Sequence, residues 1–348
     1  MFNFNEINIE SCIAHYIGSK LEDEGIQFSE HPLNLGDENT MLNLLGYFIG
    51  PFKPGEYFHL SHEEDLNRNE VYASARKIFE NPESLEEESV NLANHLYDQS
   101  THPKIKNGEF YVVYFTNCMF DGETVDAVGL FKSENKENFL KVKTAKGGIE
   151  LLCESGINVN KLDKGCIIFN IEEENGYILS IVDTVNKGTE AQYWRDQFIG
   201  VKPRKDEYHQ TRNYLDMCKT FVLDQVPKEF DVSKADQADF LNKSADYFKK
   251  NEEFAFDEFT DQVINQPEVV ESFKQYKKQY ETENACQIDD EFVISAPAVK
   301  KEAKVFKSVI KLDKNFHIYV HGNREYIVKG FDEKTGMNYY QIFFKEES

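Results

Sequence analysis

The amino-acid sequence predicts an α+β protein: a helical N-terminal segment packed on an antiparallel sheet, followed by a helical segment and a C-terminal strand-rich module. Three changes of pattern lead to this prediction. Apolar residues follow helical spacing up to about residue 105, change to a β-type pattern from Gly108, and return to helical spacing after residue 188. Consecutive strands with short turns favour an antiparallel meander over a doubly wound sheet. We therefore expect two domains, residues 1–187 and 188–348.

The first hundred residues are expected to be mostly helical. Residues 41–52 have the apolar content of a buried helix, and residues 70–81 carry apolar side chains near helical spacing. Pro82 can occupy the first turn of the next helix, where its missing N–H costs nothing. An acidic run in that first part suits the helix dipole: Glu83, Glu86, Glu87 and Glu88.

The clearest element of the sequence is a β-hairpin. FYVVYFTNCMF and ETVDAVGLFK are strand-like runs, and Asp121-Gly122 between them is a strong turn signal. Four further strands with turn residues between them are expected at residues 138–144, 149–153, 165–171 and 177–182. We expect the sheet of the first domain to be built from these runs.

Helical patterns fill most of the second domain. Residues 189–198 hold Trp194, the one tryptophan, and residues 205–226 form a long helix candidate that ends at a proline. Ser233 and Asp236 have the spacing of a capping box in an acidic variant. Two more helices are expected at residues 256–263 and 268–280; residues 292–303 are ambiguous, and residues 305–345 are strand-rich.

The composition limits the function. Lys and Arg number 39 against 62 Asp and Glu, giving a formal net charge of -23 that disfavours a DNA-coating protein on charge alone. No apolar run approaches the ~20 residues of a membrane span, and the N-terminus lacks the pattern of a secretory signal. Six scattered cysteines without a C-x-x-C motif are expected to be reduced thiols in a cytoplasmic protein.

Catalytic chemistry has little support in the sequence. No nucleotide-binding glycine motif, nucleophile elbow or zinc-protease motif is present, so we expect no catalytic residue, no metal and no cofactor. His59 and His62 have a spacing that can share a metal, but a structural or surface role is the better interpretation. A metal-dependent nuclease would need carboxylates and a lysine on the hairpin, and the candidates match no nuclease spacing: Asp121, Glu123, Asp126 and Lys132.

Two segments are locally basic. Residues 199–220 hold five basic residues against three acidic ones, and residues 300–345 hold ten against five. The terminal segment interleaves its lysines with aromatic residues, namely Phe306, Phe316, Tyr319, Tyr326, Tyr339 and Tyr340. These rings could stack on nucleic-acid bases or form a core below solvated lysines, and the second interpretation is preferred.

Several stretches together resemble one known family. The hairpin FYVVYFTNCMFDGETVDAVGLFKSE, the strands FNIEEENGYILSIVD and the helix lead-in FIGVKPRKDEYHQTRNYLDMCKTFV resemble bacterial nucleoid-associated proteins of the NdpA type. The likeness runs from about Phe110 to the C-terminus and depends on the order of many weak matches. It implies a cytoplasmic protein of the nucleoid that acts through DNA or through DNA-handling enzymes such as type II topoisomerases, without catalytic residues.

We therefore expect a non-enzymatic nucleoid-associated protein. The resemblance implies nucleic-acid contacts at Lys202, Arg204, Lys205 and Arg212. An acidic protein–protein adaptor or inhibitor that mimics the charge of DNA is the alternative, and a cryptic metal-dependent nuclease is a third hypothesis. No membrane partner is expected, and the oligomeric state stays open, with a homodimer among the alternatives.

Overall fold

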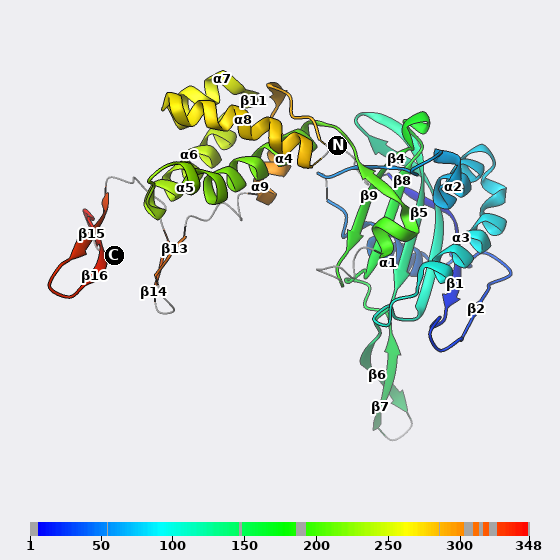
Figure 1. The fold of residues 1–348 in the computed structure, drawn as a ribbon. Coiled ribbons are helices and arrows are strands. Elements are labelled where there is room, and N and C mark those ends of the chain that lie inside the picture. Colours follow the sequence, from blue (N-terminus) through cyan, green and yellow to red (C-terminus); the bar gives the residue numbers. More distant parts are fainter. Residues whose placement is uncertain are drawn as a thin grey trace. The chain divides into compact units, whose positions relative to one another are not determined.

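The computed structural model describes residues 6–53, 55–145, 148–185, 193–284, 286–302, 309–312, 316–319 and 326–346 (Figure 1). The chain divides into two compact units, Met1–Arg204 (unit 1) and Lys205–Ser348 (unit 2). The expected domain boundary between residues 187 and 188 lies outside the described residues. Within the described ranges, no helix is both long enough and apolar enough to cross a membrane.

Unit 1 is built on an eight-stranded antiparallel sheet, which confirms the α+β prediction. Its strands, in spatial order, are β10 (Val201–Pro203), β3 (Phe58–Leu60), β9 (Ile178–Asp183), β8 (Lys164–Phe169), β5 (Glu123–Ser133), β4 (Gly108–Phe120), β1 (Asn8–Ile17) and β2 (Ile26–Gln27). The predicted hairpin is β4–β5. Its turn residues Asp121 and Gly122 have φ of 47° and 89°, the left-handed values that a tight hairpin turn requires.

The expectation of a mostly helical N-terminal third is wrong for β1. This strand pairs along its length with β4, with a register irregularity between Ile9 and Ser11. Its alternation is broken by polar residues that the fold buries, as at His15, which is 2% exposed and whose Nε2 lies 2.9 Å from Ser89 Oγ. A polar residue inside a strand hides the period of two that identifies it in the sequence.

Helices cover both faces of the sheet. On one face lie α2 (Glu70–Glu80), α3 (Leu85–Gln99) and the π-helical turn η5 (Tyr193–Ile199); α1 (Glu38–Ile49) lies on the other (Figure 1). Strand β4 accordingly sends Phe110 and Val112 into one core and Tyr111 and Val113 into the other. A strand covered on both faces has a continuous run of apolar residues in the sequence. This run is why the hairpin was predictable.

A second hairpin stands apart from the main sheet. Strands β6 (Glu137–Ala145) and β7 (Gly148–Gly156) pair only with each other among the described strands and project from unit 1 (Figure 1). The sequence predicts both strands but not their separation from the meander. Their side chains are mostly exposed.

Unit 2 is a helical module with an aromatic core. Its elements are α4 (Glu207–Thr220), η6 (Phe221–Gln225), α5 (Val226–Glu229), α6 (Lys234–Lys250), β11 (Glu253–Ala255), α7 (Phe256–Phe259), η7 (Thr260–Ile264), α8 (Pro267–Glu283), β12 (Glu291–Val293) and α9 (Ala296–Glu302). Tyr214 sits at the centre, with its ring centroid 4.1 Å from that of Phe254. The predicted capping box between Ser233 and Asp236 starts α6 and is confirmed.

Two small hairpins follow, β13 (Val309–Leu312) with β14 (Phe316–Tyr319) and β15 (Ile327–Asp332) with β16 (Met337–Ile342). The preferred interpretation of the terminal aromatic residues as a core is largely wrong. Tyr340 packs against a small apolar cluster that includes Ile310 and Ile327, whereas four others are exposed: Phe316, Tyr319, Tyr326 and Tyr339. Phe306 lies outside the described residues.

Candidate functional site

The four residues predicted to contact nucleic acid fall on both sides of the division between the units. Lys202 is exposed on the edge strand β10, and Arg204 follows that strand. Lys205 is the exposed first residue of unit 2, and Arg212 lies half-buried in α4. Their joint role as a DNA contact stays a prediction.

Arg204 is held by an ion-pair network inside unit 1. Its Nη2 donates to Oε1 of Glu172 at 2.6 Å, and His59 Nε2 lies 2.7 Å from the other carboxylate oxygen. The side chains of Arg204 and Glu172 are only 24% and 28% exposed. Burial raises the pKa of the Glu172 carboxyl, but the hydrogen bonds from Arg204 and His59 outweigh it and hold that pKa below its ordinary value.

The backbone presents Glu172 to these partners from a tight turn. Glu172 has φ of 57° and precedes η3 (Glu173–Asn175), while its carbonyl accepts from the N–H groups of Asn175 and Tyr177. Gly176 closes the turn with φ of 103°, where a Cβ would lie 2.1 Å from the carbonyl oxygen of Leu60. Only glycine fits this approach of the turn to β3.

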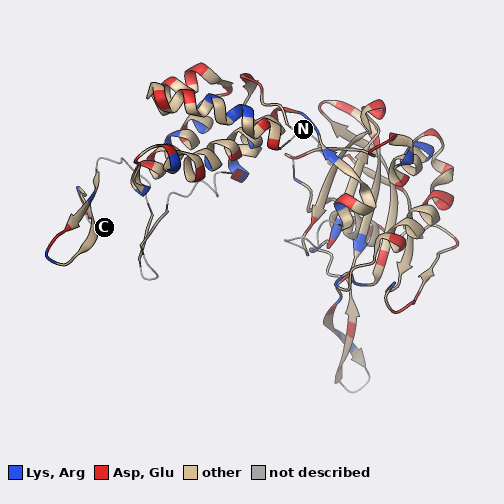
Figure 2. Ribbon diagram, viewed as in Figure 1, with Lys and Arg blue, Asp and Glu red and all other residues tan. Residues whose placement is uncertain are grey.

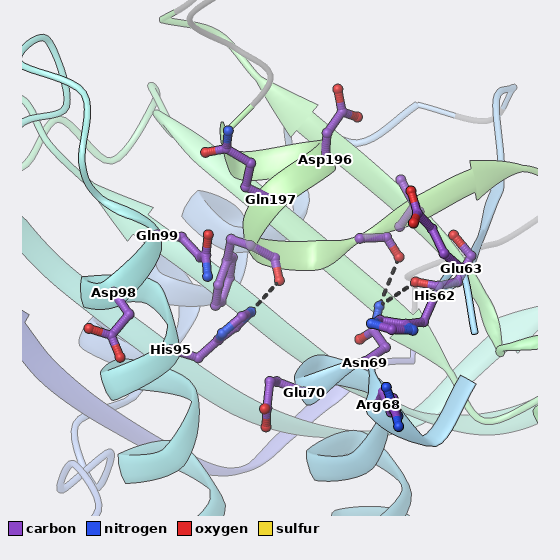
Figure 3. A pocket seen from close by; sticks show the side chains of 14 residues that line it. His62, Glu63, Arg68, Asn69, Glu70, His95, Asp98, Gln99, Asp196 and Gln197 are labelled. Carbon is purple, nitrogen blue, oxygen red and sulfur yellow. Dashed lines mark hydrogen bonds between the residues drawn. The ribbon is translucent and has the colours of Figure 1, made fainter. Parts of the chain in front are cut away.

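A large hollow of unit 1 lies near this network. It is a cavity of about 840 Å³ between the loop after β3, the start of α2, the end of α3, and η5 with β10 (Figure 3). We call it the acidic cleft because its lining includes four carboxylate residues: Glu63, Glu70, Asp98 and Asp196. Arg68 is the one Lys or Arg in that lining, and it pairs with Glu64.

Asn69 fixes the walls of the acidic cleft. Its Nδ2 lies 2.9 Å from each of three carbonyl oxygens, those of Ser61, Ile199 and Gly200, and its Oδ1 accepts from the N–H of Tyr72. The same side chain therefore caps α2 and ties it to β10 and the loop after β3. Gly200 has φ of 68°, and a Cβ there would lie 2.7 Å from Asn69 Nδ2.

Two histidines complete the lining. His95 Nε2 lies 2.9 Å from the carbonyl oxygen of Phe198, so it carries the proton and donates (Figure 3). His62 Nδ1 accepts from the N–H of Glu64. His59 turns to Glu172 instead, so the two histidines of the His59-x-x-His62 spacing face different partners. Among the described residues no group of three or more His, Cys, Asp and Glu is placed to hold a metal ion.

Unit 1, which contains the acidic cleft, carries mostly negative charge. Unit 1 contains 18 Lys and Arg against 34 Asp and Glu, a formal net charge of -16. Figure 2 shows acidic residues along α2 and α3, with Arg76 and Lys77 as the basic residues of α2. The negative electrostatic potential in such a hollow attracts cations and repels the phosphates of nucleic acid.

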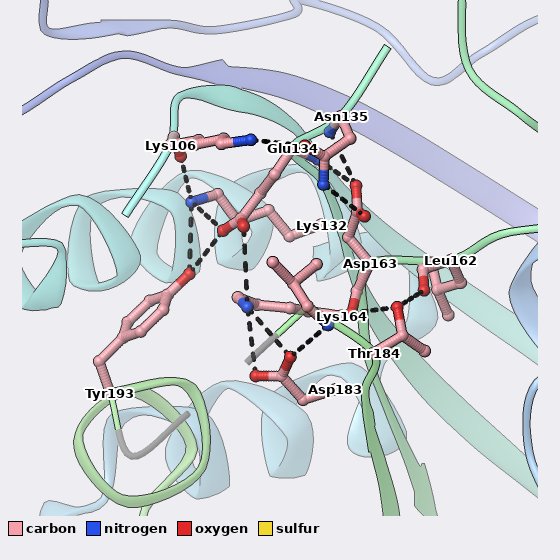
Figure 4. Close-up of polar contacts among 11 residues, drawn as sticks. Lys106, Lys132, Glu134, Asn135, Leu162, Asp163, Lys164, Asp183, Thr184 and Tyr193 are labelled. Carbon is pink, nitrogen blue, oxygen red and sulfur yellow. Dashed lines mark hydrogen bonds and ion pairs between the residues drawn. The ribbon is translucent and has the colours of Figure 1, made fainter. Parts of the chain in front are cut away.

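A buried ion cluster lies at the end of β5, and the sequence did not reveal it (Figure 4). Lys132 and Lys164 are directly opposed on β5 and β8, and both side chains are 0% exposed. Glu134 joins them, with its two oxygens 3.1 Å from Lys132 Nζ and 3.7 Å from Lys164 Nζ. Asp183 lies 3.1 Å from Lys164 Nζ, and Tyr193 donates to Glu134 at 2.9 Å.

The buried ion cluster joins β5, β8, β9 and η5. Its role is structural, because it holds these elements together. Burial lowers the pKa of Lys132, against the opposing effect of Glu134, and raises the pKa of Tyr193 well above its ordinary value. The two lysine side chains have no exposed surface, so they give a substrate no access. The only signal in the sequence is a lysine at the end of one apolar run, Lys132, and another at the start of a second run, Lys164.

The nuclease hypothesis finds no geometric support in this part of the fold. Glu123 starts β5 at the turn, whereas Lys132 lies nine residues further along, roughly 30 Å away at the rise of a strand. Asp126 accepts from the Tyr114 hydroxyl at 2.8 Å. These hairpin residues therefore do not converge on one pocket.

Comparison with known proteins assigns the family. The profile of a family described as nucleoid-associated protein YejK (NA37) matches residues 13–336. The chain belongs to this family of nucleoid-associated proteins, as the resemblance from Phe110 onward predicted. The match also includes most of the N-terminal third. No curated protein matches the chain.

Proposed function

We propose that this nucleoid-associated protein is a non-enzymatic binding protein that docks a DNA-handling enzyme, such as a type II topoisomerase, through the acidic cleft. The observation that carries the proposal is the lining of the cleft, which holds four carboxylate residues and a single arginine that pairs with Glu64. Asp98 pairs with Lys20 and Asp196 with Arg195, two cations outside the lining, and the lining itself keeps three more carboxylates than cations. The proposal includes a location at the nucleoid in the cytoplasm.

The negative charge of the cleft indicates which kind of partner surface would bind there. Enzymes that handle DNA present lysine and arginine to its phosphates, and a carboxylate-lined hollow offers those side chains charge-assisted hydrogen bonds. The formal net charge of -16 on unit 1 would also steer a basic surface towards it. Asn69 supports the proposal because it holds three walls of the cleft in place before any partner arrives.

Direct contact with DNA is the second candidate. It is favoured by the exposure of Lys202 and Lys205, which flank Arg204. The charge of Arg204 is largely compensated by Glu172, so this contact would depend on the two lysines. In this candidate, DNA affinity would fall with rising salt in proportion to the few phosphates contacted.

Charge reversal in the acidic cleft tests the proposal. Glu63 and Asp196 are exposed cleft residues, and the double variant Glu63→Lys/Asp196→Lys should weaken binding of a purified type II topoisomerase about tenfold or more. The matched control Glu30→Lys/Glu123→Lys makes the same change in net charge at exposed positions outside the cleft lining, and it should leave most of the affinity. Equal losses in the two variants would reject the cleft as the docking site.

A further inference from the structure

Unit 2 contains a hollow of its own, which we call the unit 2 pocket. It has a volume of about 520 Å³ and is lined by η6, α5, the segment before α6, the first half of α6, η7 and the start of α8. Its walls are mostly apolar, with a valine from each of η6, α5, η7 and α8 and the rings of Phe230 and Phe240. Apolar walls with a few polar groups are the usual character of a small-molecule site.

One polar side chain of this pocket is only half satisfied. Gln237 lines the pocket and is 4% exposed. Its Nε2 donates to the carbonyl oxygen of Val222 at 2.8 Å, whereas its buried Oε1 has no hydrogen-bond partner among the described residues. The amide cannot be turned over, because the carbonyl of Val222 accepts and does not donate. Since an unpaired buried acceptor is destabilising, this position favours a ligand that brings an N–H or O–H group.

The lining of the unit 2 pocket has a negative balance of charge. Its described residues include Asp231, Asp236 and Asp239, with Lys243 as the one Lys or Arg. Lys243 pairs with Asp239 at 2.8 Å, and Asp236 takes part in the capping box of α6. Asp231 is exposed and has no ion pair among the described residues. The pocket therefore offers a buried acceptor, Gln237, and an exposed carboxylate, Asp231.

These features together select one class of ligand. A purely apolar molecule would leave the Oε1 of Gln237 unpaired, and an anion would be repelled by the carboxylates. An inorganic cation would leave the apolar walls in contact with water. A lysine side chain of a protein partner brings one ammonium group, whereas the buried acceptor and the exposed carboxylate are two separate positions. A methylene chain with ammonium groups at several points meets all these conditions.

We propose that the unit 2 pocket binds an aliphatic polyamine. The methylene chain packs against the valines and phenylalanines, one ammonium group donates to Oε1 of Gln237, and another pairs with Asp231. An ammonium group has three donors, and the faces of Phe230 and Phe240 attract such cations as well. The carboxylates of Asp236 and Asp239 also lie in the lining and compensate the charge of the ligand. All these residues belong to unit 2, so the inference does not depend on docking through the acidic cleft of unit 1.

Calorimetric titration of the full chain with spermidine tests the ligand class. The wild type should bind one spermidine with a Kd on the order of 10 to 100 μM at physiological ionic strength. Hexaamminecobalt(III) has the same charge and N–H donors but no methylene chain, so it should bind at least about tenfold more weakly. Butylamine, which has one ammonium group like a lysine side chain, should also bind at least about tenfold more weakly. Equal affinity for either control compound, or no saturable binding of spermidine, would overturn the proposal.

Two aspartates provide a matched pair of variants for the position of the site. Asp231 and Asp224 are both exposed, and Asp224 lies outside the lining of the pocket. Asp231→Asn should weaken spermidine binding about tenfold, because a charge-assisted contact is lost. Asp224→Asn makes the same change in net charge and should change the affinity by about twofold or less. Equal effects of the two variants would contradict a polyamine site in this pocket.

Gln237→Met tests the buried acceptor. Methionine has a similar length and no carbonyl oxygen, so the affinity for spermidine should fall about tenfold or more. The helical circular dichroism signal checks that the variant is folded, and Asp231→Asn at its exposed position tests the pocket if it is not. An unchanged affinity in folded Gln237→Met would show that the acceptor does not contact the ligand and would overturn the proposal.

Discussion

Arg204 donates from Nη2 to Oε1 of Glu172 at 2.6 Å, and this contact changes the meaning of the basic segment. The sequence presents Arg204 as one of a run of cations. In the fold its ion pair with Glu172 holds the turn before β9 against the edge of the sheet. The exposed cations beside it are Lys202 and Lys205.

Replacement of this arginine should therefore affect stability more than DNA binding. Arg204→Ala should lower the free energy of unfolding of unit 1 by about 1 kcal/mol, a value reduced for the partial exposure of the pair. Urea unfolding followed by Trp194 emission reports unit 1 alone, because Trp194 is the one tryptophan. Lys202→Ala serves as the control and should leave the midpoint unchanged. A large loss of DNA affinity in Arg204→Ala with an unchanged midpoint would show that Arg204 contacts DNA instead.

The buried ion cluster should be the most sensitive polar site of unit 1. Glu134→Gln removes the carboxylate between Lys132 and Lys164 and leaves buried Lys132 without it, beside Lys164, which keeps its pair with Asp183, at a cost of about 3–5 kcal/mol. The Trp194 transition should move to much lower urea. Glu137→Gln, three residues along the chain and exposed, is the control and should behave like the wild type. A Glu134→Gln midpoint close to that of the wild type would refute a structural role for the cluster.

Replacement of Asn69 should destabilise unit 1 even when the new residue is aspartate. Asn69→Asp keeps an oxygen that can cap α2 in place of the amide oxygen, but it points a second oxygen at the carbonyls of Ser61, Ile199 and Gly200. It should destabilise unit 1 by about 1–3 kcal/mol, because the three carbonyls lose their donor. Asp37→Asn, at the cap of α1, keeps its capping acceptor and should leave the unfolding midpoint close to that of the wild type. Similar small losses in both variants would mean that the three contacts of Asn69 contribute little.

His15 should make the stability of unit 1 depend on pH. Its Nδ1 accepts from the N–H of Ser29 and burial lowers its pKa from 6.5, so the folded state holds the neutral ring. Above pH 6.5 the ring is neutral in both states; below it the unfolded chain binds a proton first. Stability should then fall as the pH decreases through the folded pKa, by at most about 1.4 kcal/mol per pH unit. His15→Gln should remove this part of the slope below pH 6.5, and an unchanged slope would contradict the assignment.

Local patterns predicted the elements whose partners are close in the chain. The β4–β5 hairpin and the cap of α6 follow from turn and capping residues a few positions apart. Strand β1 was missed because its polar residue His15 is satisfied by Ser89, 74 residues away. The sequence shows that a side chain is charged or polar, but not which distant group compensates it.

The same limit explains why the sequence did not reveal the candidate site. Arg204 and Glu172 are 32 residues apart, and Lys132 meets Tyr193 across 61 residues. The acidic cleft also collects residues from four separate stretches of the chain, so its carboxylates form no motif. Net charge indicated an acidic docking surface as an alternative, and the position proposed for it, the acidic cleft, is visible only in the fold.

The salt dependence of topoisomerase binding tests the central claim most directly. For wild-type protein, the affinity for a purified type II topoisomerase should fall steeply as salt is raised, because the cleft carboxylates pair with the partner's cations. The slope should become clearly shallower in Glu63→Lys/Asp196→Lys and stay close to the wild-type value in Glu30→Lys/Glu123→Lys and in Lys202→Glu/Lys205→Glu. A slope that is unchanged in the cleft variant, or that changes only when Lys202 and Lys205 are reversed, would contradict docking through the acidic cleft.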